Sequence, residues 1–390
     1  MIARSLPVHS PRAVAEALGQ RGIDAVRADA AAGGMTAAAI ELSDLDESTL
    51  LALVHHAGVL GLEIITGKDW AVLGGALARL AALARPWGGP PPLAEVAAQV
   101  GPLLPGEPAA LWRTARGPIP LDRPVILGIL NLTPDSFSDG GRYLEPEAAL
   151  HQADQLLADG AQVLDLGGES TRPGSEPVAE PVELQRVIPI LEALVRRHPS
   201  LPISVDTVKA GVARTALAAG AAAVNDVSAG RLDADMGATA ARAGAGIILM
   251  HSRGTVSTMA RLDHAEYAPD VVTAVRAELK TALEAAERAG VPADQIVLDP
   301  GLGFAKTAEQ NLVVCDRLAV LASLGRPVLV GPSRKRFLGS ATGREVPDRD
   351  VATAAACVMA FERGARLFRV HNVAVTRDAL AVAAAVRGGY

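Results

Sequence analysis

From about Ala109 to the C-terminus, short runs of Val, Ile and Leu alternate with longer segments whose apolar residues recur at helical spacing. Continuous short apolar runs are typical of strands buried on both faces, and the longer segments of helices packed against them. About eight strand–helix units in about 280 residues predict a closed (β/α)8 TIM barrel. An open, doubly wound sheet is the structural alternative. The predicted strands are Val125–Leu130, Val163–Gly167, Ile203–Asp206, Ala223–Asp226, Gly246–His251, Ile296–Asp299, Pro327–Gly331 and Leu367–Val370, and the predicted helices include Glu180–Arg197, Val208–Ala219, Asp270–Ala289 and Arg349–Arg363.

Residues 1–105 follow a different pattern, rich in Ala, Leu and Gly, which predicts a small N-terminal α/β module. The tract Pro86–Pro92 cannot continue a helix and is interpreted as a linker, and a second Pro/Gly cluster ends near Pro108. The sequence therefore predicts two domains, the module over 1–105 and the barrel over 109–390, and no motif indicates what the module does. Its predicted elements are helices near Arg12–Gln20, Glu47–Gly58, Trp70–Ala84 and Leu93–Val100, and strands near Thr36–Leu42 and Leu62–Thr66.

Polar and charged residues stand at the C-terminal end of nearly every predicted barrel strand. These ends converge on one mouth, where loops on a rigid scaffold carry binding groups. The first two strands run into long polar, glycine-rich loops, Thr133–Gly141 and Asp165–Pro177, and Phe137 in the first loop predicts a ligand or partner to pack against. So many polar groups on one rim predict a site there. They are Asn131, Ser204, Asp206, Asn225, Asp226, His251, Asp299, Lys306, Ser333, Arg334, Lys335, Arg336, Arg369 and His371.

The charges on this rim divide by type. Cationic side chains follow strands seven and eight, where barrels tend to hold phosphate groups. Asp206, Asn225 and Asp299 lie across the barrel and suit a flat heterocycle rich in N–H donors, such as an aminopyrimidinone. Asn131 is a neutral oxygen ligand suited to a Mg²⁺ ion that stays mostly hydrated. The residues predict a barrel with two substrates, one with an anionic leaving group.

Composition narrows the class of protein. The formal net charge is -6 and no Lys/Arg-rich tract is present, so no field for nucleic acid is expected. No apolar run approaches the roughly 20 residues that span a bilayer, and the N-terminus lacks the apolar core of a signal peptide. Cys315 and Cys357 fall in predicted helices without metal-ligand spacing, which favours structural thiols. We expect a cytoplasmic enzyme.

The barrel also carries seven motifs, GILNLTPDSFSDGG, DLGGESTRPGS, SVDT, NDVSAG, DPGLGFAK, GPSRKRFLG and RVH. Together, over about Ala109 to Tyr390, they resemble the motifs of the dihydropteroate synthases and stand in the order of that family. The resemblance implies a transferase of folate biosynthesis, the target of sulfonamides. It would condense 6-hydroxymethyl-7,8-dihydropterin diphosphate with p-aminobenzoate to 7,8-dihydropteroate and pyrophosphate, with Mg²⁺ as cofactor and a homodimer as the assembly.

The resemblance also implies roles for individual residues. The expected pterin-binding residues are Asp206, Asn225, Asp299 and Lys335, with Met250 and Phe304 lining the slot. The diphosphate and Mg²⁺ are expected at Asn131, Arg369 and His371, and the p-aminobenzoate side at Phe137, Thr171, Arg172 and Pro173. The residues expected to act in catalysis are Asp206, Lys335, Arg369 and His371.

Two positions depart from the family pattern. Asn372 stands after RVH where an Asp is usual, and Arg253 adds a charge after the fifth strand. Two other functions remain open. A pterin-binding methyltransferase of the corrinoid-dependent type is similar in barrel and slot but has no diphosphate to hold. A barrel kept as a non-catalytic subunit is predicted to lose charged rim residues.

Overall fold

The computed structural model describes residues 2–5, 18–19, 21–23, 39–84, 91–101, 109–133, 146–170 and 175–386. Contacts divide the chain into two compact units, Met1–Glu107 with Ala322–Leu324 and Pro108–Leu321 with Gly325–Tyr390. Most of the predicted helix at Arg12–Gln20 and of the predicted linker lies outside the described residues. No helix of the described residues is long and apolar enough to cross a membrane.

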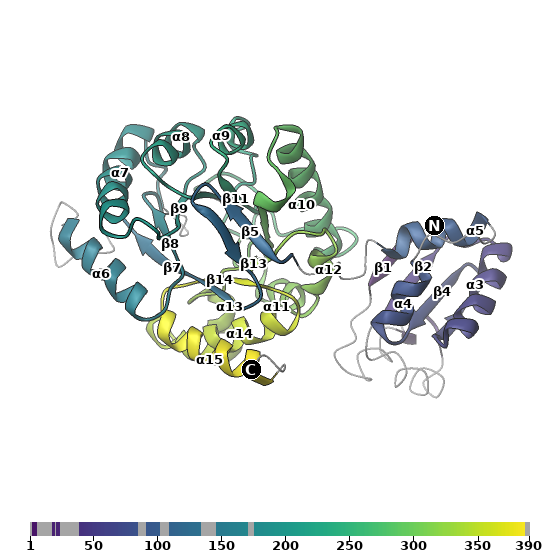
Figure 1. The fold of residues 1–390 in the computed structure, drawn as a ribbon. Coiled ribbons are helices and arrows are strands. Elements are labelled where there is room, and N and C mark those ends of the chain that lie inside the picture. Colours follow the sequence, from purple (N-terminus) through teal and green to yellow (C-terminus); the bar gives the residue numbers. More distant parts are fainter. Residues whose placement is uncertain are drawn as a thin grey trace. The chain divides into compact units, whose positions relative to one another are not determined.

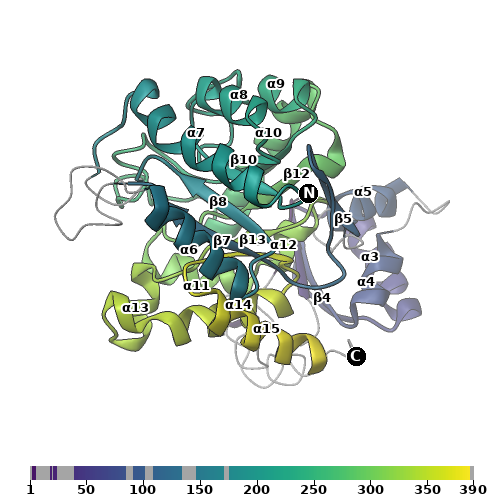
Figure 2. The ribbon, with the colours of Figure 1, turned by 60° about the vertical axis from the view of Figure 1, so that its left-hand side comes forward.

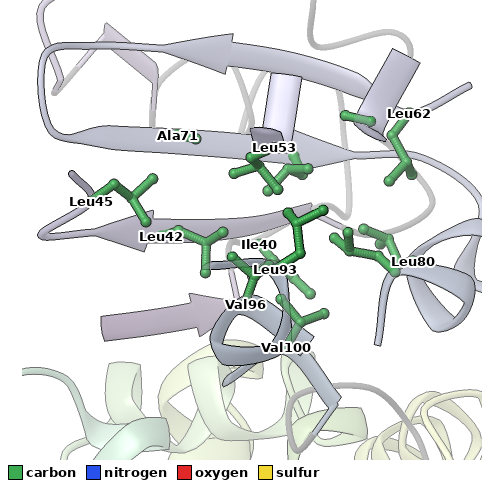
Figure 3. Close-up of a cluster of buried hydrophobic side chains, with 13 residues drawn as sticks. Ile40, Leu42, Leu45, Leu53, Leu62, Ala71, Leu80, Leu93, Val96 and Val100 are labelled. Carbon is green, nitrogen blue, oxygen red and sulfur yellow. The ribbon is translucent and has the colours of Figure 1, made fainter. Parts of the chain in front are cut away.

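The first unit contains an antiparallel sheet of four strands in the order β1-β2-β4-β3. Asp46 caps the N-terminus of helix α3, since its side chain accepts a hydrogen bond from the Thr49 amide, and Gly61, in the left-handed region, caps the C-terminus. Leucine and valine side chains from the strands and helices form one buried cluster (Figure 3). The elements are β1 Ile2–Ser5, β2 Ala39–Ser43, α3 Glu47–Leu60, β3 Glu63–Thr66, β4 Trp70–Gly74, α4 Leu77–Leu83 and α5 Pro91–Val100.

One predicted element of this unit is wrong. The expected helix Trp70–Ala84 is a central strand, β4, followed by a short helix, α4. β4 pairs with β2 on one side and β3 on the other, and Val72 and Leu73 are fully buried. A short apolar run in a central strand has no period that distinguishes it from a buried helix, which explains the error. Gly75, with φ of 150°, separates the two elements.

The second unit is the predicted barrel. Its eight parallel strands run in the order β12-β11-β10-β9-β8-β7-β14-β13, and a parallel bridge from Leu298 to Val328 joins the two outer strands. Helices surround the strands (Figure 1). The strands are β7 Val125–Asn131, β8 Val163–Gly167, β9 Ile203–Asp206, β10 Ala223–Asp226, β11 Gly246–Met250, β12 Ile296–Asp299, β13 Leu329–Val330 and β14 Leu367–Val370. All eight predicted strands are confirmed, with small differences in bounds.

The helices of the barrel also agree with the prediction to within a few residues where one was made. They are α6 Pro146–Ala158, α7 Glu180–Arg197, α8 Ala210–Ala218, α9 Met236–Arg242, α10 Val271–Arg288, α11 Ala308–Asp316, α12 Ala319–Ala322, α13 Arg336–Thr342, α14 Asp350–Glu362 and α15 Val373–Val386, with 3-10 turns at Ala293–Gln295 and Val346–Asp348.

A hairpin that the sequence pattern did not predict covers the N-terminal end of the barrel (Figure 2). Its strands are β5 Leu111–Thr114 and β6 Gly117–Pro120. Trp112 is fully buried beneath it, and its indole N–H donates to the carbonyl of Gln295 at 2.9 Å. Trp112 also joins a core cluster with side chains from the barrel strands. The hairpin therefore covers one end of the barrel and leaves the C-terminal end for a site.

Candidate active site

An ion-pair network crosses the C-terminal mouth of the barrel. Arg369 on β14 donates from Nε to Asp165 Oδ2 on β8 at 2.5 Å and from Nη2 to Asp206 Oδ2 on β9 at 2.7 Å. Asn225 on β10 donates from Nδ2 to the same Asp165 oxygen at 3.1 Å. Strand register brings these groups together, because Gly167, two residues after Asp165, lies opposite Asp206, which in turn lies opposite Asn225. Three of the predicted site residues thus meet around Asp165.

Asp165 is the site residue that the sequence reasoning did not single out. It lies inside strand β8 and its side chain is fully buried. Its sequence signal is a carboxylate within an otherwise apolar buried strand, since such a group needs a charged or hydrogen-bonding partner.

Burial and charge act in opposite directions on this network. Burial raises the pKa of Asp206 above the ordinary range of an aspartate, although the Arg369 guanidinium acts to lower it. Burial lowers the pKa of Arg369, but the carboxylates of Asp165 and Asp206 outweigh it and the pKa is raised. Arg369 is therefore a permanent cation between two buried carboxyl groups.

Three buried polar atoms beside the network have no hydrogen-bond partner among the described residues. They are Asp165 Oδ1, Ser204 Oγ and Asn225 Oδ1. Buried polar atoms are nearly always paired, and an unpaired one calls for a ligand, a water or an ion. The two carbonyl-type oxygens are acceptors, so a ligand rich in N–H donors matches them.

A second charged pair lies where β12 ends. Asp299 Oδ1 accepts from the Gly301 amide at 2.7 Å, and burial raises the pKa of its carboxyl. Lys335 donates from Nζ to the Leu302 carbonyl and lies 4.3 Å from the centre of the Phe304 ring. Burial lowers the pKa of Lys335 to about 8, although Asp299 acts to raise it. Lys335 is thus held against the segment that follows Asp299.

Met250 and Phe304 form an apolar wall beside these polar groups. Both are buried and belong to one cluster with Val208, Val227 and Met259, among others. An apolar wall beside a few placed acceptors is typical of a small-molecule site.

Asn131 and His371 lie on the remaining part of the rim. Asn131 ends β7, and a Cβ added at Gly167 would lie 3.9 Å from both Asn131 Oδ1 and Asp206 Oδ2, so the two side chains face the same glycine. The Nδ1 atom of His371 lies 2.9 Å from Ser333 Oγ, which also accepts from the His371 amide at 3.1 Å. Ser333 therefore orients the imidazole.

No group of three or more His, Cys, Asp or Glu side chains arranged to hold a metal occurs among the described residues. A single amide oxygen at Asn131 fits an ion that keeps several waters and is held mainly by substrate oxygens, which is how Mg²⁺ commonly binds. The donor set thus fits a hydrated Mg²⁺ and does not form a protein cage.

Both departures from the family pattern have partners in the structure. Arg253 donates from Nε to Glu278 Oε2 at 3.2 Å and lies 3.9 Å from the Tyr267 ring centre. Asn372 donates from Nδ2 to Asp350 Oδ2 at 2.8 Å, and the same carboxylate accepts two hydrogen bonds from Arg334, at 2.8 and 3.0 Å. Aspartate at position 372 would face the Asp350 carboxylate, so an amide suits this position.

The residues predicted for the p-aminobenzoate side lie outside the described residues. They are Phe137, Thr171, Arg172 and Pro173. Residues that flank the second loop are described, and Ser175 Oγ donates to Ser170 Oγ at 2.8 Å. The residues on either side of 171–174 are therefore hydrogen-bonded to each other.

Comparison with known proteins places this geometry in a family. The model of the family described as "Pterin binding enzyme" matches residues 127–371. The dihydropteroate synthase of Synechocystis is 47% identical over 252 residues, covering 64% of this chain and 86% of that protein. The corresponding protein of Mycobacterium leprae is 44% identical over 266 residues, covering 67% and 92%.

Solved structures agree. The Xanthomonas albilineans dihydropteroate synthase with 4-aminobenzoic acid matches with a TM-score of 0.66 and 45% identity, covering 72% of this chain and 98% of that one. The same enzyme in complex with 7,8-dihydropteroate matches with a TM-score of 0.62 and 43% identity, covering 69% and 96%. The chain therefore belongs to the dihydropteroate synthase family of pterin-binding enzymes.

Proposed function

We propose that this chain is a transferase that condenses 6-hydroxymethyl-7,8-dihydropterin diphosphate with p-aminobenzoate to give 7,8-dihydropteroate and pyrophosphate. The observation that carries the proposal is the network of Asp165, Arg369, Asp206 and Asn225, with two unpaired buried acceptors beside an apolar wall. One relative, the Xanthomonas albilineans dihydropteroate synthase, is 43–45% identical to this chain and is described in complex with 4-aminobenzoic acid and with 7,8-dihydropteroate.

The pterin ring fits the acceptor side of the mouth. Its amino group and ring N–H groups are donors, which match the free oxygens of Asp165 and Asn225. Met250 and Phe304 would cover the ring, and Lys335 beside Phe304 would donate to a ring carbonyl. This arrangement places donors and acceptors on the two sides of the same slot.

The charges of the site support the following course of the reaction. When the bond between the pterin carbon and the diphosphate oxygen breaks, the electron pair leaves with pyrophosphate and positive charge develops on the pterin. The Asp206 carboxyl lies at the network's edge beside the Arg369 guanidinium, which favours its ionised form against burial. A negative charge there, in a partly dry site, would stabilise that cation. The p-aminobenzoate nitrogen forms the new carbon–nitrogen bond and loses a proton.

The diphosphate is proposed to bind between Lys335, Arg369 and His371. Arg369 bonds to the two carboxylates through Nε and Nη2, and the remaining N–H donors of its guanidinium would contact the diphosphate without an exchange of partners. Asn131 is the residue that would hold Mg²⁺, and a bound Mg²⁺ supplies charge neutralisation for the leaving group. The p-aminobenzoate side is proposed at Phe137, Thr171, Arg172 and Pro173.

Phosphorus NMR tests this function directly. Pyrophosphate should appear when the protein is mixed with the pterin diphosphate, Mg²⁺ and p-aminobenzoate, and release should be much slower without p-aminobenzoate. Release that ignores p-aminobenzoate, or none at all, would contradict the proposal. The names of the relatives do not favour the corrinoid-dependent alternative, and the charged rim residues of the described part do not favour a non-catalytic barrel.

We further propose a homodimer in the cytoplasm. Exposed apolar side chains on α14 and α15, among them Val351, Val382 and Val386, support contact with a second copy. Sedimentation of the wild type and of Val382→Glu compares the two states, and a monomeric wild type would contradict the proposal.

A further inference from the structure

Lys306 is a buried lysine that the proposed chemistry does not use. It follows β12, is 3% exposed, and its Nζ lies 2.9 Å from His251 Nδ1. It also donates to the carbonyls of Gly301 and Phe304, at 3.2 Å each. Burial lowers the pKa of Lys306 to about 7. In its ammonium form the side chain has three hydrogens and accepts nothing, so three acceptors at these distances satisfy it. Lys306 therefore ties the segment Gly301–Ala305 to the end of strand β11.

His251 extends this tie toward the surface. Because its Nδ1 accepts from Lys306, its Nε2 carries the hydrogen and donates to Glu278 Oε2 at 3.1 Å. Burial lowers the pKa of His251 to about 4, so the ring is neutral near pH 7. Glu278 on α10 also accepts from Arg253 through both Nε and Nη2. Consecutive hydrogen bonds thus connect a series of four side chains, from Lys306 to Arg253.

Arg253, at the other end of this hydrogen-bonded series, is connected through Tyr267 back to the segment Gly301–Ala305. Arg253 Nη1 donates to the carbonyls of His264 and Glu266, at 3.3 and 2.5 Å, and its guanidinium lies over the Tyr267 ring. The Tyr267 hydroxyl in turn donates to the Ala305 carbonyl at 2.9 Å. These side chains therefore hold the loop after β11 and the segment after β12 together at two places, in addition to the backbone hydrogen bond from the Ala305 amide to the Met259 carbonyl at 2.8 Å.

The segment Gly301–Ala305 needs such support. Gly301, Gly303 and Ala305 have φ angles of 65°, 83° and 46°, in the left-handed region, which for a residue with a side chain costs about 1 kcal/mol or more. The segment carries the Phe304 ring of the proposed pterin slot. Its Leu302 carbonyl accepts from Lys335. A shift of this segment would move both pterin contacts.

We propose that Lys306 and Arg253 are positioning residues for the pterin slot. Lys306 lies at the buried end of the hydrogen-bonded series and Arg253 at its partly exposed end. Together they hold Phe304 and Lys335 where the pterin ring binds. The inference rests on the proposed function, and it assigns a purpose to Arg253, a residue that departs from the family pattern.

The test is Lys306→Met, which keeps the length of the side chain and removes the three hydrogen bonds. The KM for the pterin diphosphate and the Kd for the bare pterin alcohol, measured by calorimetry, should both rise by about tenfold to a hundredfold, the effect of losing hydrogen bonds to a charged group. The KM for p-aminobenzoate should stay within about twofold. The matched control is Lys280→Met, because Lys280 lies on α10 like Glu278 but, within the part of the chain that the structure describes, forms its ion pair with the exposed Glu284.

Arg253 supplies a second variant that does not disturb the core. Arg253→Met should raise the pterin KM in the same direction and by less, about threefold to tenfold, because Lys306 still holds the segment from inside. Arg253→Lys keeps a charge beside Glu278 but loses the planar fork, so its pterin KM should fall between wild type and Arg253→Met.

The outcomes separate the two proposals. A wild type without turnover contradicts the proposed function itself. With an active wild type, unchanged pterin affinity in both variants overturns the positioning role, as does an equal rise in both KM values or a fall in melting temperature alone. If Lys306→Met does not fold, Arg253→Met decides, and a pterin KM equal to wild type overturns the proposal.

Discussion

Replacing Arg369 with methionine should destabilise the protein even when no ligand is bound. The guanidinium pairs at once with Asp165, which is fully buried, and with Asp206, which is 11% exposed. Removing it leaves two neighbouring carboxylates in a poorly hydrated mouth, and Asp165 keeps only the Asn225 amide as donor. Removing one partner of a buried ion pair costs about 3–5 kcal/mol. Two lost hydrogen bonds to charged groups, at about 1.5–3 kcal/mol each, give the same range.

Urea unfolding at pH 7 measures this loss, and the chain offers a matched control. Arg363 is 21% exposed, against 20% for Arg369, but its partner Asp316 is 25% exposed and not fully buried. Arg363 also donates to the carbonyls of Asp316 and Met359, at 2.8 and 3.2 Å. Its removal leaves no fully buried carboxylate behind, so Arg363→Met should lose about 1–2 kcal/mol, less than Arg369→Met. Similar losses in the two variants would refute the argument that the buried carboxylates make Arg369 costly to remove.

Replacing Asp165 tests whether its buried charge causes the loss of stability in Arg369→Met. Asp165→Asn removes one uncompensated charge, so in the Arg369→Met background it should restore part of the lost stability, while in the wild type it should reduce stability. Additive losses would show that Asp165 and Arg369 do not act together.

The same variant shows what Arg369 does with substrate. Calorimetry compares the pterin diphosphate with the bare pterin alcohol. If the guanidinium also donates to the diphosphate, Arg369→Met weakens binding of the pterin diphosphate far more than binding of the alcohol. Equal weakening of the two ligands would mean that Arg369 acts on the ring side, through Asp165 and Asp206.

Three further predictions follow from the structure and are tested separately. Asp206→Asn should lower turnover by about two orders of magnitude, the effect of losing one electrostatic group in a site, and near-normal turnover would contradict its role. Bonds from His251 and Arg253 hold the pKa of Glu278 at about 2 against burial, below the ordinary 4.5. The unfolded chain then binds more protons between these values, so the stability difference between wild type and Glu278→Gln should shrink as pH falls from about 4.5 toward 2. A protein that starts at Ala109 should fold and keep its turnover, and a soluble but inactive product would show that the first unit contributes to the site.

The barrel strands were predictable because burial on both faces gives each of them a continuous apolar run. Strands β8, β9, β10, β12 and β14 have the predicted bounds. The β5–β6 hairpin was not predictable from a local pattern, because it is anchored by the hydrogen bond from Trp112 to the Gln295 carbonyl, 183 positions away. β4 was missed for a related reason: its strand character comes from pairing with β2 and β3, which a local pattern does not contain.

The site was predictable as a set of residues but not as a set of pairs. Residues at strand ends, such as Asp206, Asn225 and Asp299, are brought to one mouth by the barrel topology alone. Which of them touch depends on strand register and on the reach of long side chains. Arg369 was expected at the diphosphate with His371, whereas in the described structure it bonds to Asp165 and Asp206. No local pattern indicates a contact across 204 positions of chain.

Arg253 and Asn372, the two departures from the family pattern, also show that partners distant in the sequence decide what a residue does. Taken singly, Arg253 is an unexplained added charge and Asn372 an unexplained lost one. In the fold, the charge of Arg253 is balanced by Glu278. Asn372 donates a hydrogen bond to Asp350, whose charge Arg334 already balances. Neither position therefore adds an uncompensated charge to the mouth, and the proposed diphosphate side can keep its positive character. A substitution near a site is thus judged by the partner that the fold supplies, because the partner decides whether the net charge of the site changes.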